Sequence, residues 1–180
     1  FTLPYGLNYI VLFILFLGIL NSFNLMDGLD GLVTGFSLII ASMCFLLSIN
    51  SPSTFLPYFS SAIIGTTLGF LKFNANPARI FLGDSGSLTL GYLLSGIVIL
   101  VSLNKSLNGG VISPASAYSI DLAFIIIALA VPIVDTIRVI FTRLNNKRNP
   151  FLADADHLHH ILYSKNIEHK TVVLLIHLFS

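Results

Sequence analysis

The sequence predicts an all-α, polytopic integral membrane protein with five full transmembrane helices and the beginning of a sixth. Hydrophobic residues make up 55% of the chain and charged residues only 9%, the mean hydropathy is +0.90, and long apolar runs recur along the chain. A soluble domain carries about a quarter charged residues, so this surface needs lipid as its solvent. The net charge of +1 offers nucleic acid no basic field, and the single cysteine, Cys44, excludes a disulfide framework and a cysteine-based metal site.

Each predicted span is an apolar run close to the roughly 20 residues that a helix needs to cross a bilayer. The runs are rich in Leu, Ile, Phe and Val without strand-type alternation, and a helix satisfies its own backbone groups in lipid. They cover residues 7–23, 32–49, 55–73, 88–103 and 122–141, and a sixth begins near Thr171. The start of the chain has no signal-peptide pattern. We treat residues 1–180 as one transmembrane domain, and we expect it to be the C-terminal portion of a larger multi-span protein.

The charges predict the orientation of these spans. If the first span ends in the cytoplasm, the cytoplasmic segments are 24–31, 74–87 and 142–170. Of nine Lys and Arg residues, only Lys105 falls on the other side, and of eight acidic residues, only Asp121 does. Basic residues favour the cytoplasmic side of a membrane. The polar side chains therefore gather at the inner face.

The first polar motif, NSFNLMDGLDG at residues 21–31, connects the first two predicted spans. Asp27 and Asp30 are three residues apart, so on a helical turn they would share a face. Gly28 lets the backbone approach a ligand closely, and Asn24 adds an amide. An ordinary interfacial turn is the alternative, because Asp-Gly pairs are common in turns. Acidic and amide groups between spans are costly near lipid and usually functional, so we predict a site here.

The second motif, FLGDSGSLTLG at residues 81–91, introduces an apolar helix. Asp84 could cap that helix. It could also bind Mg²⁺ (or Mn²⁺), since Mg²⁺ is usually held by one or two carboxylates together with substrate phosphates. A helix N-terminus also favours phosphate. The two roles are compatible, because Ser85 or Ser87 can cap the helix while Asp84 holds the metal.

The third motif, ADADHLHH, ends a basic segment and contains His157, His159 and His160. Zinc uses histidine and carboxylate ligands, but this spacing differs from that of a helical zinc motif. The nearby cations would also repel a metal ion. We favour a diphosphate site in which imidazole, Lys and Arg donate hydrogen bonds. His169 and His177 are assigned no role.

Together, NSFNLMDGLDGL, FLGDSGSLTLG and PFLADADHLHHIL resemble the polyprenyl-phosphate N-acetylhexosamine-1-phosphate transferases, which are the MraY-, WecA- and TagO-like membrane enzymes of glycosyltransferase family 4. The resemblance links about Phe13 to Leu162, and the spacing of the final histidines is closer to the WecA and TagO branch. It implies that a lipid phosphate oxygen attacks the β-phosphorus of a UDP-N-acetylhexosamine. UMP is released and a lipid-diphosphate-sugar starts cell-envelope polysaccharide synthesis, with N-acetylglucosamine as the expected sugar.

The resemblance also implies roles for single residues. Asp84 would be the Mg²⁺ ligand, while Asn24, Asp27, Gly28 and Asp30 would line the nucleotide and catalytic cleft. The three histidines of the third motif would contact diphosphate or sugar. The expected setting is the inner (plasma) membrane, with a multi-pass enzyme whose active face is cytoplasmic. Its partners would be the UDP-sugar, polyprenyl phosphate and, as one expected assembly, a second copy of itself.

One feature of that family, an Asp-Asp pair on an earlier cytoplasmic segment, has no match within residues 1–180. We therefore expect the 180-residue chain alone to be inactive. Within the family, a phospho-MurNAc-pentapeptide transferase is the alternative. An ion- or proton-coupled transporter is another, since intramembrane acids mark ion paths, although transporter sites lie near the bilayer midplane and these acids cluster at span ends. A structural pseudoenzyme is the third.

Overall fold

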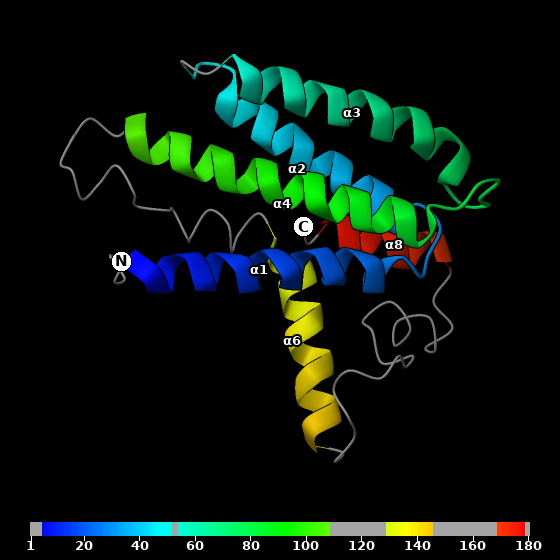
Figure 1. The fold of residues 1–180 in the computed structure, drawn as a ribbon. Coiled ribbons are helices and arrows are strands. Elements are labelled where there is room, and N and C mark those ends of the chain that lie inside the picture. The colour runs from blue at the N-terminus through cyan, green and yellow to red at the C-terminus, as the bar shows by residue number, and fades with distance from the viewer. Residues whose placement is uncertain (1–4, 52–53, 109–128, 146–168, 179–180) are drawn as a thin grey trace.

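The computed structural model describes residues 5–51, 54–108, 129–145 and 169–178, and the regular structure in these segments is entirely helical. Figure 1 shows the arrangement. The helices are α1 (Tyr5–Met26), α2 (Leu32–Ser48), α3 (Phe55–Asn74), α4 (Gly83–Asn108), α6 (Ala130–Asn145) and α8 (His169–Leu178). The predicted all-α class is thus confirmed for the described residues.

The helices lie on the predicted apolar runs, but several extend beyond the predicted bounds, and two of these differences concern the polar motifs. Helix α1 continues to Met26, so Asn24 lies in its last turn and not in the connecting segment. Helix α4 begins at Gly83, whereas the predicted span began at residue 88. The polar residues at its start are compatible with a helix: the Thr89 hydroxyl bonds back to the Ser85 carbonyl at 2.6 Å, and the Ser87 hydroxyl lies 3.1 Å from the Gly83 carbonyl. Asp84 therefore lies in the first helical turn.

The helices pack in two main pairs, α2 with α3 and α1 with α4, and α2 also contacts α4 and α8. Figure 1 shows that the end of α1, the start of α2, the end of α3 and the start of α4 all lie at the same end of this bundle. The connections at residues 27–31 and 75–82 are therefore neighbours. The predicted cytoplasmic segments 24–31 and 74–87 meet at this end.

The core lies where α1, α2 and α4 meet. Phe23 and Phe36 are fully buried, and their ring centroids are 5.7 Å apart. Gly91 lets α1 and α4 approach closely, because a Cβ added there would lie 3.1 Å from the Leu20 Cα and 3.1 Å from the Phe23 Cβ. This contact fixes how the C-terminal half of α1 sits against the N-terminal half of α4, and hence where their polar ends lie.

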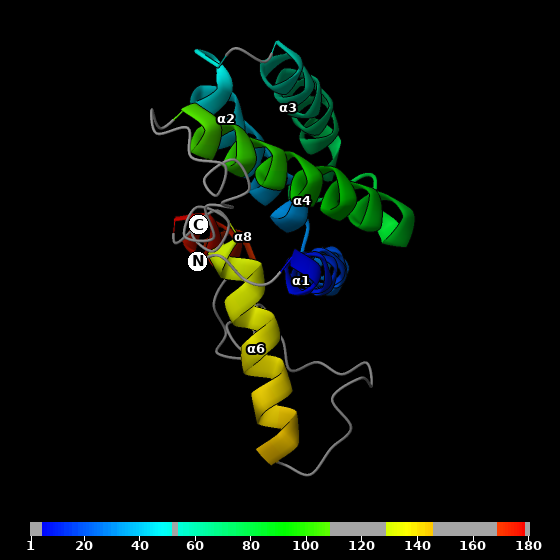
Figure 2. The ribbon, with the colours of Figure 1, turned by 60° about the vertical axis from the view of Figure 1, so that its left-hand side comes forward.

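Helix α6 leaves the bundle: it stands at a steep angle to α1 in Figure 1 and extends away from the other helices in Figure 2. Val134, Ile137 and Phe141 are exposed along it. Residues 122–128 of the predicted fifth span lie outside the described residues. Among the described residues, Gly83–Leu103 is long and apolar enough to cross a membrane, and Leu12–Met26 and Leu32–Ser48 are shorter apolar helices. The prediction of five full spans is therefore untested.

Candidate active site at the helix ends

The first motif folds as a tight connection between α1 and α2. Backbone N–H groups of Gly28 and Leu32 donate to the carbonyls of Met26 and Leu29, at 2.8 and 3.1 Å. Gly31 precedes α2 with φ of 76°, a left-handed conformation that glycine adopts without a steric penalty. A Cβ at Gly31 would also lie 3.4 Å from the Ala75 Cα. The last glycine of the motif is thus favoured by the backbone conformation, while the space beside it would leave a Cβ in ordinary van der Waals contact.

Asn74, the last residue of α3, holds three segments together. Its side chain is buried, with 4% exposure. Its Oδ1 accepts hydrogen bonds from the Gly31 N–H at 3.1 Å and from the Thr34 hydroxyl at 2.7 Å, while its Nδ2 donates to the Ile80 carbonyl at 3.0 Å. One amide therefore joins α3 to the start of α2 and to the segment that leads into α4. Sequence reasoning missed this residue, although an Asn at the polar end of an apolar run was a usable signal.

Asp30 faces the connection between α3 and α4. Its Oδ2 accepts hydrogen bonds from the Asn76 Nδ2 at 3.0 Å and from the Ala78 N–H at 3.1 Å. The prediction that Asp27 and Asp30 share a face of a helical turn is wrong, because residues 27–30 form a non-helical turn and the two carboxylates contact different partners. In this structure, Asp30 holds the 75–82 connection in place.

Asp27 lies against the start of α4, where Gly83 and Asp84 are its neighbours. Burial raises the pKa of Asp27, a hydrogen bond from the Gly83 backbone amide opposes this effect, and the negative charge of Asp84 raises the pKa further. The net result is a pKa above the ordinary value of 3.8. Two carboxylates from separate motifs therefore lie close enough for the charge of Asp84 to disfavour the ionised form of Asp27. The pair is a place where a cation would be stabilised.

Asn24 is linked to the same turn of α4. The Ser87 hydroxyl donates to the Asn24 Oδ1 at 2.7 Å, and Ser87 is fully buried. The tertiary structure thus places Asn24 and Asp27 from the first motif against the first turns of α4, where Asn24 contacts Ser87 and Asp27 lies near Asp84. Gly28 is exposed beside them.

The remaining predicted residues contribute nothing further to this geometry. His157, His159 and His160 lie outside the described residues. Within the segments that the structure describes, no three His, Cys, Asp or Glu side chains gather as a possible metal site. His177, to which the sequence assigned no role, packs α8 against α2: its Nε2 lies 3.0 Å from the Leu32 carbonyl oxygen, over Gly35.

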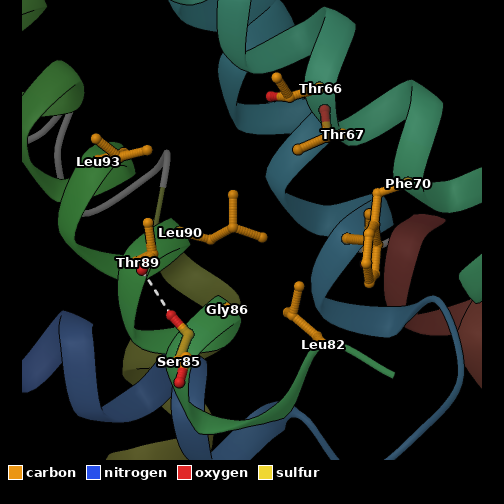
Figure 3. A pocket seen from close by; sticks show the side chains of 10 residues that line it. Thr66, Thr67, Phe70, Leu82, Ser85, Gly86, Thr89, Leu90 and Leu93 are labelled. Atoms are coloured by element: carbon orange, nitrogen blue, oxygen red, sulfur yellow. Dashed lines mark hydrogen bonds between the residues drawn. The ribbon is translucent and has the colours of Figure 1, made fainter. Parts of the chain in front are cut away.

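A cavity of about 450 Å³ opens next to Asp84, between α2, α3 and α4. Figure 3 shows Leu82 and Leu90 facing Phe70 of α3 across this space, with Ser85 and Thr89 along one side. Most of its lining is apolar; the lining residues are Thr34, Thr66, Thr67, Phe70, Leu82, Ser85, Gly86, Thr89, Leu90 and Leu93. An apolar cavity thus adjoins a turn that carries a carboxylate.

These features define a helical protein with carboxylates and an amide gathered at one end of an apolar bundle. Residues 1–102 match the sequence profile described as "Glycosyl transferase family 4". The chain belongs to this family. The family assignment gives no support to the transporter alternative.

Three relatives carry names that describe related transfers. The chain is 40% identical over 163 residues to the "Probable undecaprenyl-phosphate N-acetylglucosaminyl 1-phosphate transferase" of Bacillus subtilis (strain 168), covering 91% of the chain and 42% of the relative. It is 33% identical over 169 residues to the "Decaprenyl-phosphate N-acetylglucosaminephosphotransferase" of Mycobacterium leprae, covering 89% and 42%. It is 48% identical over 95 residues to the "Phospho-N-acetylmuramoyl-pentapeptide-transferase" of Listeria monocytogenes, covering 52% and 29%. The chain thus spans less than half the length of these relatives.

Proposed function

We propose that the protein containing this chain transfers N-acetylglucosamine 1-phosphate from its UDP-sugar to a polyprenyl phosphate. The observation that carries this proposal is the convergence of Asp27, Asp84 and Asn24 at one end of an apolar bundle. The relatives that cover about nine-tenths of the chain are named for N-acetylglucosamine phosphate transfer to prenyl phosphates. The Listeria relative covers 52%, and so we place phospho-MurNAc-pentapeptide transfer second.

In the proposed reaction, an oxygen of the lipid phosphate forms a bond to the β-phosphorus of the UDP-sugar. The bond between the β-phosphorus and the oxygen that bridges to the α-phosphorus breaks, and UMP leaves with that oxygen. The acceptor is already an anion, so the protein has to position two negatively charged substrates and offset their charge. A helix start that presents Gly83 and Asp84 beside Asp27 is suited to organising such a site.

The residues present fit a bound Mg²⁺ or Mn²⁺. Both ions favour oxygen ligands, and Mg²⁺ is usually held by one or two carboxylates together with substrate phosphates. Burial raises the pKa of Asp27 and the negative charge of Asp84 adds to this effect, so a cation at this place would favour the ionised form of Asp27. Asp84 would hold the ion, with Asp27 beside it. When bound, the ion would neutralise charge on the diphosphate oxygens.

The proposed setting is the inner face of the plasma membrane. Large apolar side chains face outward, including Ile10, Phe13 and Ile14 on α1 and Leu46 and Leu47 on α2. Exposed apolar surface of this kind is suited to lipid. The bias of basic residues then orients the 27–31 and 75–82 connections toward the cytoplasm. At that boundary a water-soluble donor and a membrane-bound acceptor can meet.

The test uses the full-length protein in membranes, with UDP-N-acetylglucosamine, a polyprenyl phosphate and Mg²⁺, and it measures lipid-linked product and UMP. We expect Asp84→Asn and Asp27→Asn each to lower turnover by about 100-fold or more, the range seen when one stabilising group is removed from a charged transition state. Asn50→Ala, an exposed amide beyond the far end of α2, is the control and keeps its activity.

Full turnover by both aspartate variants would rule out the assigned site. Preference for a UDP-MurNAc-pentapeptide donor would instead change the sugar and leave the class of reaction intact. Because the chain spans less than half of its relatives, we also expect the 180-residue piece alone to show no turnover.

A further inference from the structure

We propose that Ser87 is a positioning residue for this transfer and that it acts by fixing the amide of Asn24. Its hydroxyl donates to the Asn24 Oδ1 at 2.7 Å, across 63 residues of sequence and between α1 and α4. Ser87 is fully buried, so water does not compete for this bond. The inference rests on the proposed function, because Asn24 matters here as part of the substrate site.

The direction of the Ser87 hydroxyl follows from the distances. A hydroxyl has one proton to donate, and the carbonyl oxygens of Gly83 and Asp84 lie farther away, at 3.1 and 3.3 Å. The Asn24 oxygen is therefore the preferred acceptor. Other buried serines behave differently: the hydroxyls of Ser37 and Ser60 bond to the carbonyls of Val33 and Leu56 in their own helices, at 2.7 and 2.9 Å.

The bond decides which side of the Asn24 amide remains available. With Oδ1 committed to Ser87, the Nδ2 amino group is the part of the amide that makes no hydrogen bond to the described protein residues. Asn24 is only partly buried, so this group can donate to an anionic substrate oxygen. Without Ser87, the amide could rotate and present its oxygen instead. Ser87 therefore sets a donor that faces the substrates without touching them itself.

The experiment compares Ser87→Ala with the matched control Ser37→Ala in the full-length enzyme. Both changes remove a buried serine hydroxyl, but only Ser87 bonds across helices. We expect Ser87→Ala to lower kcat by about 10- to 100-fold, as displaced catalytic groups do. The KM for UDP-N-acetylglucosamine should change by less than about threefold. Ser37→Ala should keep its kcat.

A double-mutant cycle with Asn24→Ala separates positioning from general damage. If Ser87 acts through Asn24, adding Ser87→Ala to Asn24→Ala lowers kcat no further, and the two changes are non-additive in apparent Tm as well. The Tm measurement tests the Ser87–Asn24 hydrogen bond independently of enzyme activity. Equal losses of kcat in Ser87→Ala and Ser37→Ala, or full additivity in the cycle, would overturn this inference. An inactive wild-type protein would overturn the proposed function and this inference together.

Discussion

Replacing Asn74 with alanine removes the acceptor shared by two buried donors and tests how the site is held together. The Gly31 N–H and the Thr34 hydroxyl both lose their partner, and both residues are buried. The Ile80 carbonyl also loses a donor, but Ile80 is exposed at 41% and water can replace the amide. Each buried polar group left without a partner costs about 1–3 kcal/mol. Thr34 can recover part of this by bonding to a carbonyl of its own helix.

The expected loss for Asn74→Ala is therefore about 2–4 kcal/mol in the free energy of unfolding. At roughly 2–4 °C per kcal/mol, the apparent Tm of the full-length protein should fall by about 4–16 °C. Thr34→Val removes one donor and leaves the Gly31 N–H bonded to Asn74, so it should cost less, about 0.5–1.5 kcal/mol. Asn50→Ala, at an exposed turn, should cost little.

The assay is a thermal unfolding series on the detergent-solubilised full-length protein, with wild type, Asn50→Ala, Thr34→Val and Asn74→Ala measured side by side. We expect the apparent Tm to be lowest for Asn74→Ala, intermediate for Thr34→Val and close to wild type for Asn50→Ala. If Asn74→Ala unfolds at the temperature of Asn50→Ala, the amide does not join the three segments and the account of this end of the bundle is wrong.

Two further predictions address the site and the helix pair that carries it. Asp27→Asn should raise the apparent Tm at pH 7 in EDTA, while lowering turnover with Mg²⁺ by about 100-fold or more. Because the folded protein raises the pKa of Asp27, its charged form destabilises the fold above that pKa. The advantage of the amide should therefore shrink as the pH falls through the raised pKa toward 3.8, and a difference that is independent of pH would contradict the cause. Gly91→Ala should cost about 1–3 kcal/mol, because the new methyl group meets the backbone of α1 at Leu20. Gly96→Ala in the same helix meets nothing within 4 Å and should be neutral or stabilising by up to about 1 kcal/mol; equal effects of the two changes would argue against the close approach of α1 and α4.

The sequence by itself determined the positions of the main helices and the end of the bundle at which the first two polar motifs meet. Apolar runs placed the starts of α2 and α3 at Leu32 and Phe55, because polar turn residues interrupt hydrophobic stretches there. Two helices joined by a short connection run antiparallel, so every second connection lies at the same end of the bundle. This rule alone predicted that residues 24–31 and 74–87 lie at the same end. The residue types in those segments were enough to indicate an oxygen-rich site for anionic substrates.

Only the tertiary structure decided which polar groups meet. Asp27 and Asp30 are three residues apart, yet one lies against Gly83 and Asp84 while the other binds the 75–82 connection. The Ser87–Asn24 bond joins residues that are far apart in the sequence. Such pairings depend on the rotation of each helix about its axis. That rotation is set by close contacts such as the one at Gly91, which no local pattern of residues encodes.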